Sequence, residues 1–125
     1  MKKSFVFAIL ILFAICAYAQ QNVSRYMFTT TIVDNEPVDT LFDYVAERGG
    51  NIYFFTELRN MQGTAHHLWY KNGELIYDFK MTVGAPRWRT NSSVKAAHFK
   101  PHDELTVEVT NESGNVLALG TLSIY

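Results

Sequence analysis

The chain has 125 residues, of which 48% are hydrophobic, and it carries a formal net charge of −1. This balance lacks the basic excess by which proteins neutralise phosphates, so we do not expect nucleic acid as a partner. The single cysteine, Cys16, excludes a framework of disulfide bonds.

The N-terminus has the pattern of a secretory signal peptide. Lys2 and Lys3 precede an apolar run over residues 5–16, and residues 17–19 read Ala-Tyr-Ala, which is a small-x-small cleavage site. We therefore expect residues 1–19 to be removed. Residues 20–125 are then expected to form a single domain outside the cytoplasm, either periplasmic or secreted.

A permanent membrane anchor is not expected from this segment. As a helix, residues 5–19 reach only about 22 Å, which is short of the roughly 30 Å hydrocarbon core. Lipidation of Cys16 is a minor alternative, because Ile15 precedes it where lipoproteins generally have a small residue. Cleavage removes two of the 11 basic residues and leaves 9 against 12 acidic ones, a formal charge of −3.

The mature chain is dominated by a period-two pattern. Alternation of apolar and polar residues over 75–83 and 105–110 predicts strands with one buried face. Asn72-Gly73 predicts a two-residue type I′ hairpin turn, and residues 111–115 predict a slightly longer one. Seven strands are predicted, at residues 23–33, 51–58, 64–70, 74–83, 88–97, 104–110 and 116–125.

Seven short strands in about a hundred residues favour an immunoglobulin-like antiparallel β-sandwich. Residues 41–48 are the one segment that we expect to form a helical turn, before Gly49-Gly50.

The histidines do not form the pattern of a metal site. His66 and His67 are adjacent on a predicted strand, where neighbouring side chains point to opposite faces. His98 and His102 have helical spacing, but Pro101 lies between them in a predicted loop. We expect neither a metal ion nor another cofactor.

The sequence gives no support for an enzyme. Ser92 and Ser93 lack the glycine pattern of a nucleophile elbow, and the mature chain has no thiol. A serine with a histidine and an aspartate can be assembled in any chain of this size, so a small hydrolase is only a distant alternative.

The candidate ligand-binding residues are aromatic and cationic: His67, Trp69, Arg87, Trp88 and Arg89. Alternation puts His67 and Trp69 on one strand face, and puts Arg87 and Arg89 on the face opposite Trp88. An aromatic plane with arginine donors is typical of recognition surfaces. We place the contact where the two arginines emerge beside the strand of Trp69.

Each of these residues also has a structural alternative. Trp69 falls where immunoglobulin-like domains bury a tryptophan, so core packing is favoured for it, and less strongly for Trp88. Arg87 and Arg89 could pair with acidic neighbours, or could bond to the backbone carbonyls of a neighbouring loop.

Several motifs together resemble a bacterial family catalogued as domain of unknown function 2914. They are residues 51–58, the run His67-Leu68-Trp69-Tyr70 before Asn72-Gly73, residues 83–89 with Ser92-Ser93, and the final hairpin. The resemblance implies an exported or membrane-tethered β module and no established reaction. Two positions depart from the family pattern: Leu68 stands where arginine is usual, and Leu105 where tryptophan is usual.

The sequence thus predicts an exported, non-catalytic binding or interaction module of the bacterial cell envelope. Its expected partner is an envelope protein or glycan. The alternative is a structural accessory domain of an envelope assembly.

Overall fold

The computed structural model describes residues 20–125. The predicted signal peptide, its cleavage site and the alternative of lipidation at Cys16 lie outside the described residues.

Residues 20–125 form ten strands and two short 3-10 helices. The strands are β1 (Asn22–Thr29), β2 (Ile32–Val33), β3 (Glu36–Pro37), β4 (Asp43–Tyr44), β5 (Asn51–Arg59), β6 (Gly63–Lys71), β7 (Glu74–Val83), β8 (Arg87–Lys95), β9 (Glu104–Thr110) and β10 (Val116–Ile124), and the helices are η1 (Ala46–Arg48) and η2 (Ala96–His98).

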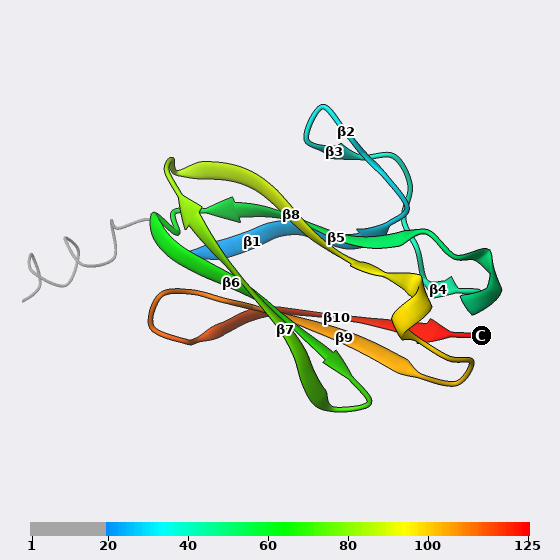
Figure 1. Ribbon diagram of the computed structural model, residues 1–125. Coiled ribbons are helices and arrows are strands. Elements are labelled where there is room, and N and C mark those ends of the chain that lie inside the picture. The colour runs from blue at the N-terminus through cyan, green and yellow to red at the C-terminus, as the bar shows by residue number, and fades with distance from the viewer. Residues whose placement is uncertain (1–19) are drawn as a thin grey trace, which may run out of the picture.

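Two sheets face each other and form a sandwich. One has the strand order β1-β5-β8, and the other has the order β4-β10-β9-β6-β7. All pairs of long strands are antiparallel, whereas the short β4 pairs with β10 in parallel. The β2–β3 hairpin stands out from the three-stranded sheet on the side away from β9 and β10 (Figure 1). The predicted sandwich is confirmed.

The seven predicted strands correspond to β1 and β5–β10, with bounds that differ by a few residues. The first predicted strand, residues 23–33, was too long at its C-terminal end. The chain leaves the sheet after Thr29 and makes the β2–β3 hairpin. Asp34 and Asn35, with φ of 51° and 61°, form its turn. The helical turn expected within residues 41–48 is present at their end as η1, after β4. A second turn, η2, was not expected and begins where the predicted strand 88–97 leaves β8.

The hairpin between β6 and β7 turns at Asn72-Gly73 as predicted. Lys71 pairs with Glu74, and φ is 52° at Asn72 and 83° at Gly73. Positive φ at both central residues is what a type I′ turn requires. The Asn72 side chain also bonds to Asp103 and to the backbone N–H of Glu104, which ties this turn to the start of β9.

The core lies between the inner faces of the two sheets. Its central aromatic residues are Phe28, Phe54 and Trp69, and the Phe28 and Phe54 rings meet edge to face with centroids 4.8 Å apart. Gly120 on β10 lies directly against them, since a Cβ there would be 2.7 Å from Phe54. Both sheets contribute to the buried cluster, for example through Ile52, Leu58, Val94, Leu105, Val107, Val109 and Leu122.

Candidate functional site

The predicted site residues do not form one surface. His67 and Trp69 are both fully buried, because the face of β6 that carries them points at the opposite sheet. Trp88 is partly buried and packs against the core beside Gly84. The expectation of an exposed surface that includes His67 and Trp69 is therefore corrected, and the core alternative for Trp69 is confirmed.

His67 and Trp69 belong to a buried polar network that joins the sheets. His67 Nδ1 lies 2.6 Å from Ser92 Oγ, and His67 Nε2 lies 2.9 Å from Thr56 Oγ1. Trp69 Nε1 donates a hydrogen bond of 2.8 Å to the same Ser92 hydroxyl. His67 and Trp69 come from the five-stranded sheet, whereas Thr56 and Ser92 come from the three-stranded sheet.

This network has a serine beside a histidine, but not the geometry of an accessible nucleophile. Ser92 is only 6% exposed and His67 is not exposed at all. The second ring nitrogen of His67 meets Thr56, where a hydrolytic triad would have a carboxylate. Burial lowers the pKa of His67 to about 3, so its ring is neutral at ordinary pH. The pair holds the sheets together.

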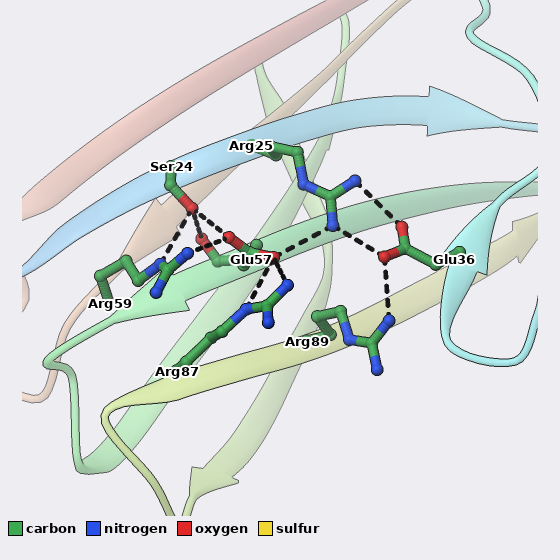
Figure 2. A network of polar contacts seen from close by, with 7 residues as sticks. All are labelled: Ser24, Arg25, Glu36, Glu57, Arg59, Arg87 and Arg89. Atoms are coloured by element: carbon green, nitrogen blue, oxygen red, sulfur yellow. Dashed lines mark hydrogen bonds and ion pairs between the residues drawn. The ribbon is translucent and has the colours of Figure 1, made fainter.

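Arg87 and Arg89 lie on the opposite, outer face of the three-stranded sheet. They are part of a network with Arg25 and Arg59, in which the four guanidinium groups converge on the carboxylates of Glu36 and Glu57 (Figure 2). We call these six side chains the arginine face. Strand register explains the convergence, since Glu57 on β5 lies between Arg25 on β1 and Arg89 on β8.

Glu57 is the centre of the arginine face. Its carboxylate lies 3.0 Å from Arg25, 2.9 Å from Arg59 and 3.1 Å from Arg87. Ser24 Oγ also donates to it, at 2.7 Å. The hydrogen bond from Ser24, together with those from Arg25 and Arg87, lowers the pKa of Glu57 to about 2 against the opposing effect of burial. Glu57 is therefore ionised at any physiological pH.

Glu36 connects the β2–β3 hairpin to the sheet. Its two oxygens accept from both terminal nitrogens of Arg25, at 3.0 and 2.9 Å, and one of them also accepts from Arg89 Nη1, at 2.9 Å. These bonds, that of Arg25 first, lower the pKa of Glu36. Arg25 also lies over the Phe55 ring, 5.0 Å from its centroid, and so helps to bury this outward-facing phenylalanine.

The arginine face has a surplus of positive charge and free donors. Four arginines against two glutamates leave a formal charge of +2. Within residues 20–125, Arg87 Nη1 and the Nε and Nη2 of Arg89 make no protein hydrogen bond. The Arg87 side chain is 58% exposed and that of Arg89 is 34% exposed. Such donors can bind the oxygens of a carboxylate or phosphate group.

Two expectations about these arginines are resolved by their contacts. The alternative of acidic partners is correct, since both bond to carboxylates and neither bonds to a loop carbonyl in the described chain. Their predicted position beside the Trp69 strand is wrong. They lie over β5 and the β2–β3 hairpin, because they point out of the sheet whose inner face meets Trp69.

The other histidines form no ion site in the described chain. His66 points outward and lies 2.6 Å from Asp78, on the face opposite the buried His67. Residues 20–125 contain no group of three or more His, Cys, Asp or Glu side chains placed to hold a metal ion. Over the same residues, no helix is long and apolar enough to cross a membrane.

Comparison with known families confirms the resemblance seen in the motifs. Residues 63–121 match the DUF2914 family, described as a protein of unknown function. The DUF2914 match runs from the start of β6 into β10 and includes the hairpin at Asn72-Gly73 and the Arg87-Trp88-Arg89 motif. The predicted motif at residues 51–58 lies outside it, as do Arg25, Glu36, Glu57 and Arg59.

A solved structure supports the architecture. An immunoglobulin-like protein from Pseudomonas aeruginosa superimposes with a TM-score of 0.55 at 14% sequence identity, covering 87% of this chain and 99% of its own. At this identity the likeness shows the fold alone, which is immunoglobulin-like as predicted. A search of curated proteins gave no match.

Sequence reasoning identified Arg87 and Arg89 but missed the other members of the arginine face. Arg25 and Glu57 lie on predicted strands, and Arg59 directly follows one, so the outward direction of their side chains could have been read from the alternation. What brings them together is the order and register of β1, β5 and β8, which no local pattern encodes. Glu36 was missed because the hairpin that carries it was missed.

Proposed function

We propose that this domain is an exported, non-catalytic binding module of the bacterial cell envelope. Its ligand is an anionic group on an envelope glycan or protein, which binds at the arginine face. Export rests on the signal-peptide pattern of residues 1–19. The non-catalytic role rests on the burial of the Ser92–His67 pair and on the DUF2914 match, to which no reaction is attached.

The observation that carries the proposal is the concentration of arginine. The chain has five arginines, and four of them lie on the arginine face although the mature domain is expected to be acidic overall. Arginines that only solubilise a surface do not need to converge. Here they form a local positive field on an acidic molecule, which favours approach of an anion from one side.

The chemistry of the free donors defines the ligand class. A guanidinium presents planar, fixed N–H groups that match the oxygen pairs of carboxylates and phosphates. Glu57 holds the side chains of Arg87 and Arg59 in place, and Glu36 holds those of Arg25 and Arg89. The unpaired donors of Arg87 and Arg89 are therefore oriented before a ligand arrives, which lowers the entropic cost of binding.

The test is a titration followed by backbone amide NMR, at low ionic strength, on protein produced from the full-length sequence. Inorganic phosphate, polyphosphate and polygalacturonate are the probes. We expect shifts at amides of β1, β5 and β8 with at least one polyanion, and we expect the affinity to fall with added salt. The double variant Arg87→Gln with Arg89→Gln should weaken this binding about tenfold or more.

Arg48→Gln is the matched control. Arg48 lies over the Tyr44 ring, 5.5 Å from its centroid, outside the arginine face, so its loss should leave binding unchanged. The double variant should also fold, because Glu57 keeps Ser24, Arg25 and Arg59 as partners. Absence of shifts with all three probes, or equal weakening by Arg48→Gln, would overturn the proposed ligand class. Recovery of the protein in the cytoplasmic fraction of its native host would overturn export.

A further inference from the structure

A second feature, independent of the arginine face, is the open edge formed by β7. In the order β4-β10-β9-β6-β7 this strand has β6 as its one neighbour among the described strands. It is ten residues long, whereas β4 at the other edge of the sheet has two residues. Long exposed edge strands are templates for pairing with another strand, and proteins usually shorten or cover them.

The inner face of β7 is incompletely covered. Phe79 and Met81 are only partly buried, and Tyr77 is 37% exposed. The rings of Tyr77 and Phe79 lie 5.8 Å apart, and Phe79 reaches the Trp69 ring at 6.4 Å. The apolar core thus continues to this edge and ends in solvent, where a further strand would extend it.

The outer face of β7 carries two opposite charges, two residues apart. Asp78 and Lys80 are both exposed, and Asp78 bonds to His66 on the neighbouring strand. A strand with a negative and a positive residue at this spacing can be complementary to itself when the pairing is antiparallel. The position of the symmetry axis decides whether it is.

We propose that β7 pairs antiparallel with β7 of a second copy of this chain, about a two-fold axis through Phe79. Such an axis, perpendicular to the sheet, keeps the side chains of residues 77–81 on their own faces, and a β-bulge between Leu75 and Tyr77 ends this regular stretch. The axis places Asp78 of each copy opposite Lys80 of the other, and Phe79 opposite Phe79. Opposite charges at directly facing positions stabilise an antiparallel pair, and like charges destabilise it.

Charge selects this register over its neighbours. An axis through Asp78 places Asp78 opposite itself, and an axis through Lys80 places Lys80 opposite itself. An axis through Tyr77 lies beside a β-bulge in β7, where Trp69 pairs with Tyr77 but Tyr70 pairs with Leu75. The register at Phe79 therefore combines uninterrupted pairing over residues 77–81 with complementary charge. It joins two five-stranded sheets into one continuous sheet and covers Tyr77 and Met81 of each copy with those of the other.

The test is sedimentation velocity over a concentration series, with charge reversals on β7. Lys80→Asp places two like pairs across the axis, and Asp78→Lys does the same with the opposite sign. We expect each single reversal to raise the dissociation constant of the dimer about tenfold. The double variant Asp78→Lys with Lys80→Asp restores opposite charges and should return the constant to within about threefold of the original.

The matched control is Lys95→Asp, which reverses an exposed lysine at the end of β8 in the other sheet and should not affect association. Thermal melting followed by circular dichroism verifies that each variant is folded. A monomer at all concentrations would overturn the proposal and would identify Lys80 as a charge that guards the edge. The proposal would also be overturned if neither single reversal changed the dissociation constant of the dimer. The same holds if the double reversal did not bring the constant back toward the original value.

Discussion

Ser92 Oγ and His67 Nδ1 lie 2.6 Å apart, and the two residues belong to opposite sheets of the sandwich. The contact lies among apolar side chains, where an unpaired polar group would be costly. Either tautomer of the neutral ring satisfies both nitrogens, through Ser92 on one side and Thr56 on the other. A protonated ring would be a buried charge without a counter-ion.

The stability of the domain should consequently fall as the medium is acidified below pH 6.5. Burial lowers the pKa of His67 from 6.5 to about 3, so between these values the unfolded chain binds a proton that the folded chain does not. The contribution of the neutral, buried His67 ring to the free energy of unfolding is complete above pH 6.5. It is lost as the pH falls toward 3. Urea unfolding should show a slope approaching about 1.4 kcal/mol per pH unit near pH 5.

His67→Gln is the control for this slope. Glutamine retains hydrogen-bonding groups but does not titrate, so the variant should lose that part of the pH dependence although it is less stable throughout. The carboxylates whose pKa is lowered, such as Glu57, act mainly below about pH 4.5. The difference between the slopes of the wild type and the variant from pH 6.5 to 4.5 therefore reports on His67. An identical slope in the variant between these values would contradict the assignment.

Removal of the Glu57 charge should destabilise the domain. Glu57→Gln leaves Arg25, Arg59 and Arg87 facing a neutral amide and should cost about 1–3 kcal/mol, a modest value because the arginine ends are partly in water. Denaturant unfolding at pH 7 measures it. The contribution of the wild-type carboxylate is present above pH 4.5 and is lost as pH falls toward about 2.

Glu108→Gln is the matched control for Glu57→Gln. Glu108 also lies on a strand, but it forms no ion pair within residues 20–125. The change should be within about 0.5 kcal/mol of neutral. Equal losses in the two variants would show that the arginine face does not depend on Glu57.

Gly120 should not tolerate a methyl group. A Cβ at this position would be 2.7 Å from the Phe54 ring and 3.1 Å from the Phe28 ring, so Gly120→Ala should cost about 1–3 kcal/mol. Gly84→Ala provides the comparison, because its Cβ would meet Trp88 at 3.5 Å, which is an ordinary contact. Equal melting temperatures for the two variants would refute the close approach at β10.

Gly73 should tolerate asparagine better than valine. With φ at 83° and open space around its Cα, the cost of substitution is the cost of the backbone conformation alone. Gly73→Val should lose on the order of 1 kcal/mol or more, and Gly73→Asn distinctly less. Thermal melting measures both. An unchanged melting temperature for the valine variant would contradict the turn assignment.

Trp69 should be more important to stability than Trp88. Trp69 is fully buried and donates to Ser92, so Trp69→Ala should cost about 3–5 kcal/mol and can leave the domain unfolded. Trp88 is only partly buried, and Trp88→Ala should cost less. A stable Trp69→Ala protein would show that the side chain is not part of the core.

Sequence alone was sufficient for the elements whose signal is local. The alternation over Glu74–Val83 and the Asn72-Gly73 pair both determine structure within a few residues, so β7 and its turn were predicted. Alternation also placed His67 with Trp69 correctly. It could not decide whether their face points inward, because that depends on the strands packed above it.

The candidate site was predictable only in part for a similar reason. Arg87 and Arg89 were correctly set on the face opposite Trp88, but their partners come from β5 and from a hairpin distant in sequence. The Asp34-Asn35 turn is a local signal that could have revealed this hairpin, since both residues adopt positive φ readily. The register that brings Glu57 to the arginines is set by the whole sheet.

Glu36 gives the arginine face an internal competitor. Its carboxylate already occupies donors of Arg25 and Arg89, and it does so from the tip of a two-stranded hairpin that projects from the sheet. An incoming oxyanion that takes these donors exchanges one carboxylate for another, and the hairpin loses its tether in the same step. Under the proposed anion binding, occupancy of the face and the position of the β2–β3 hairpin are therefore coupled equilibria, and each reports on the other.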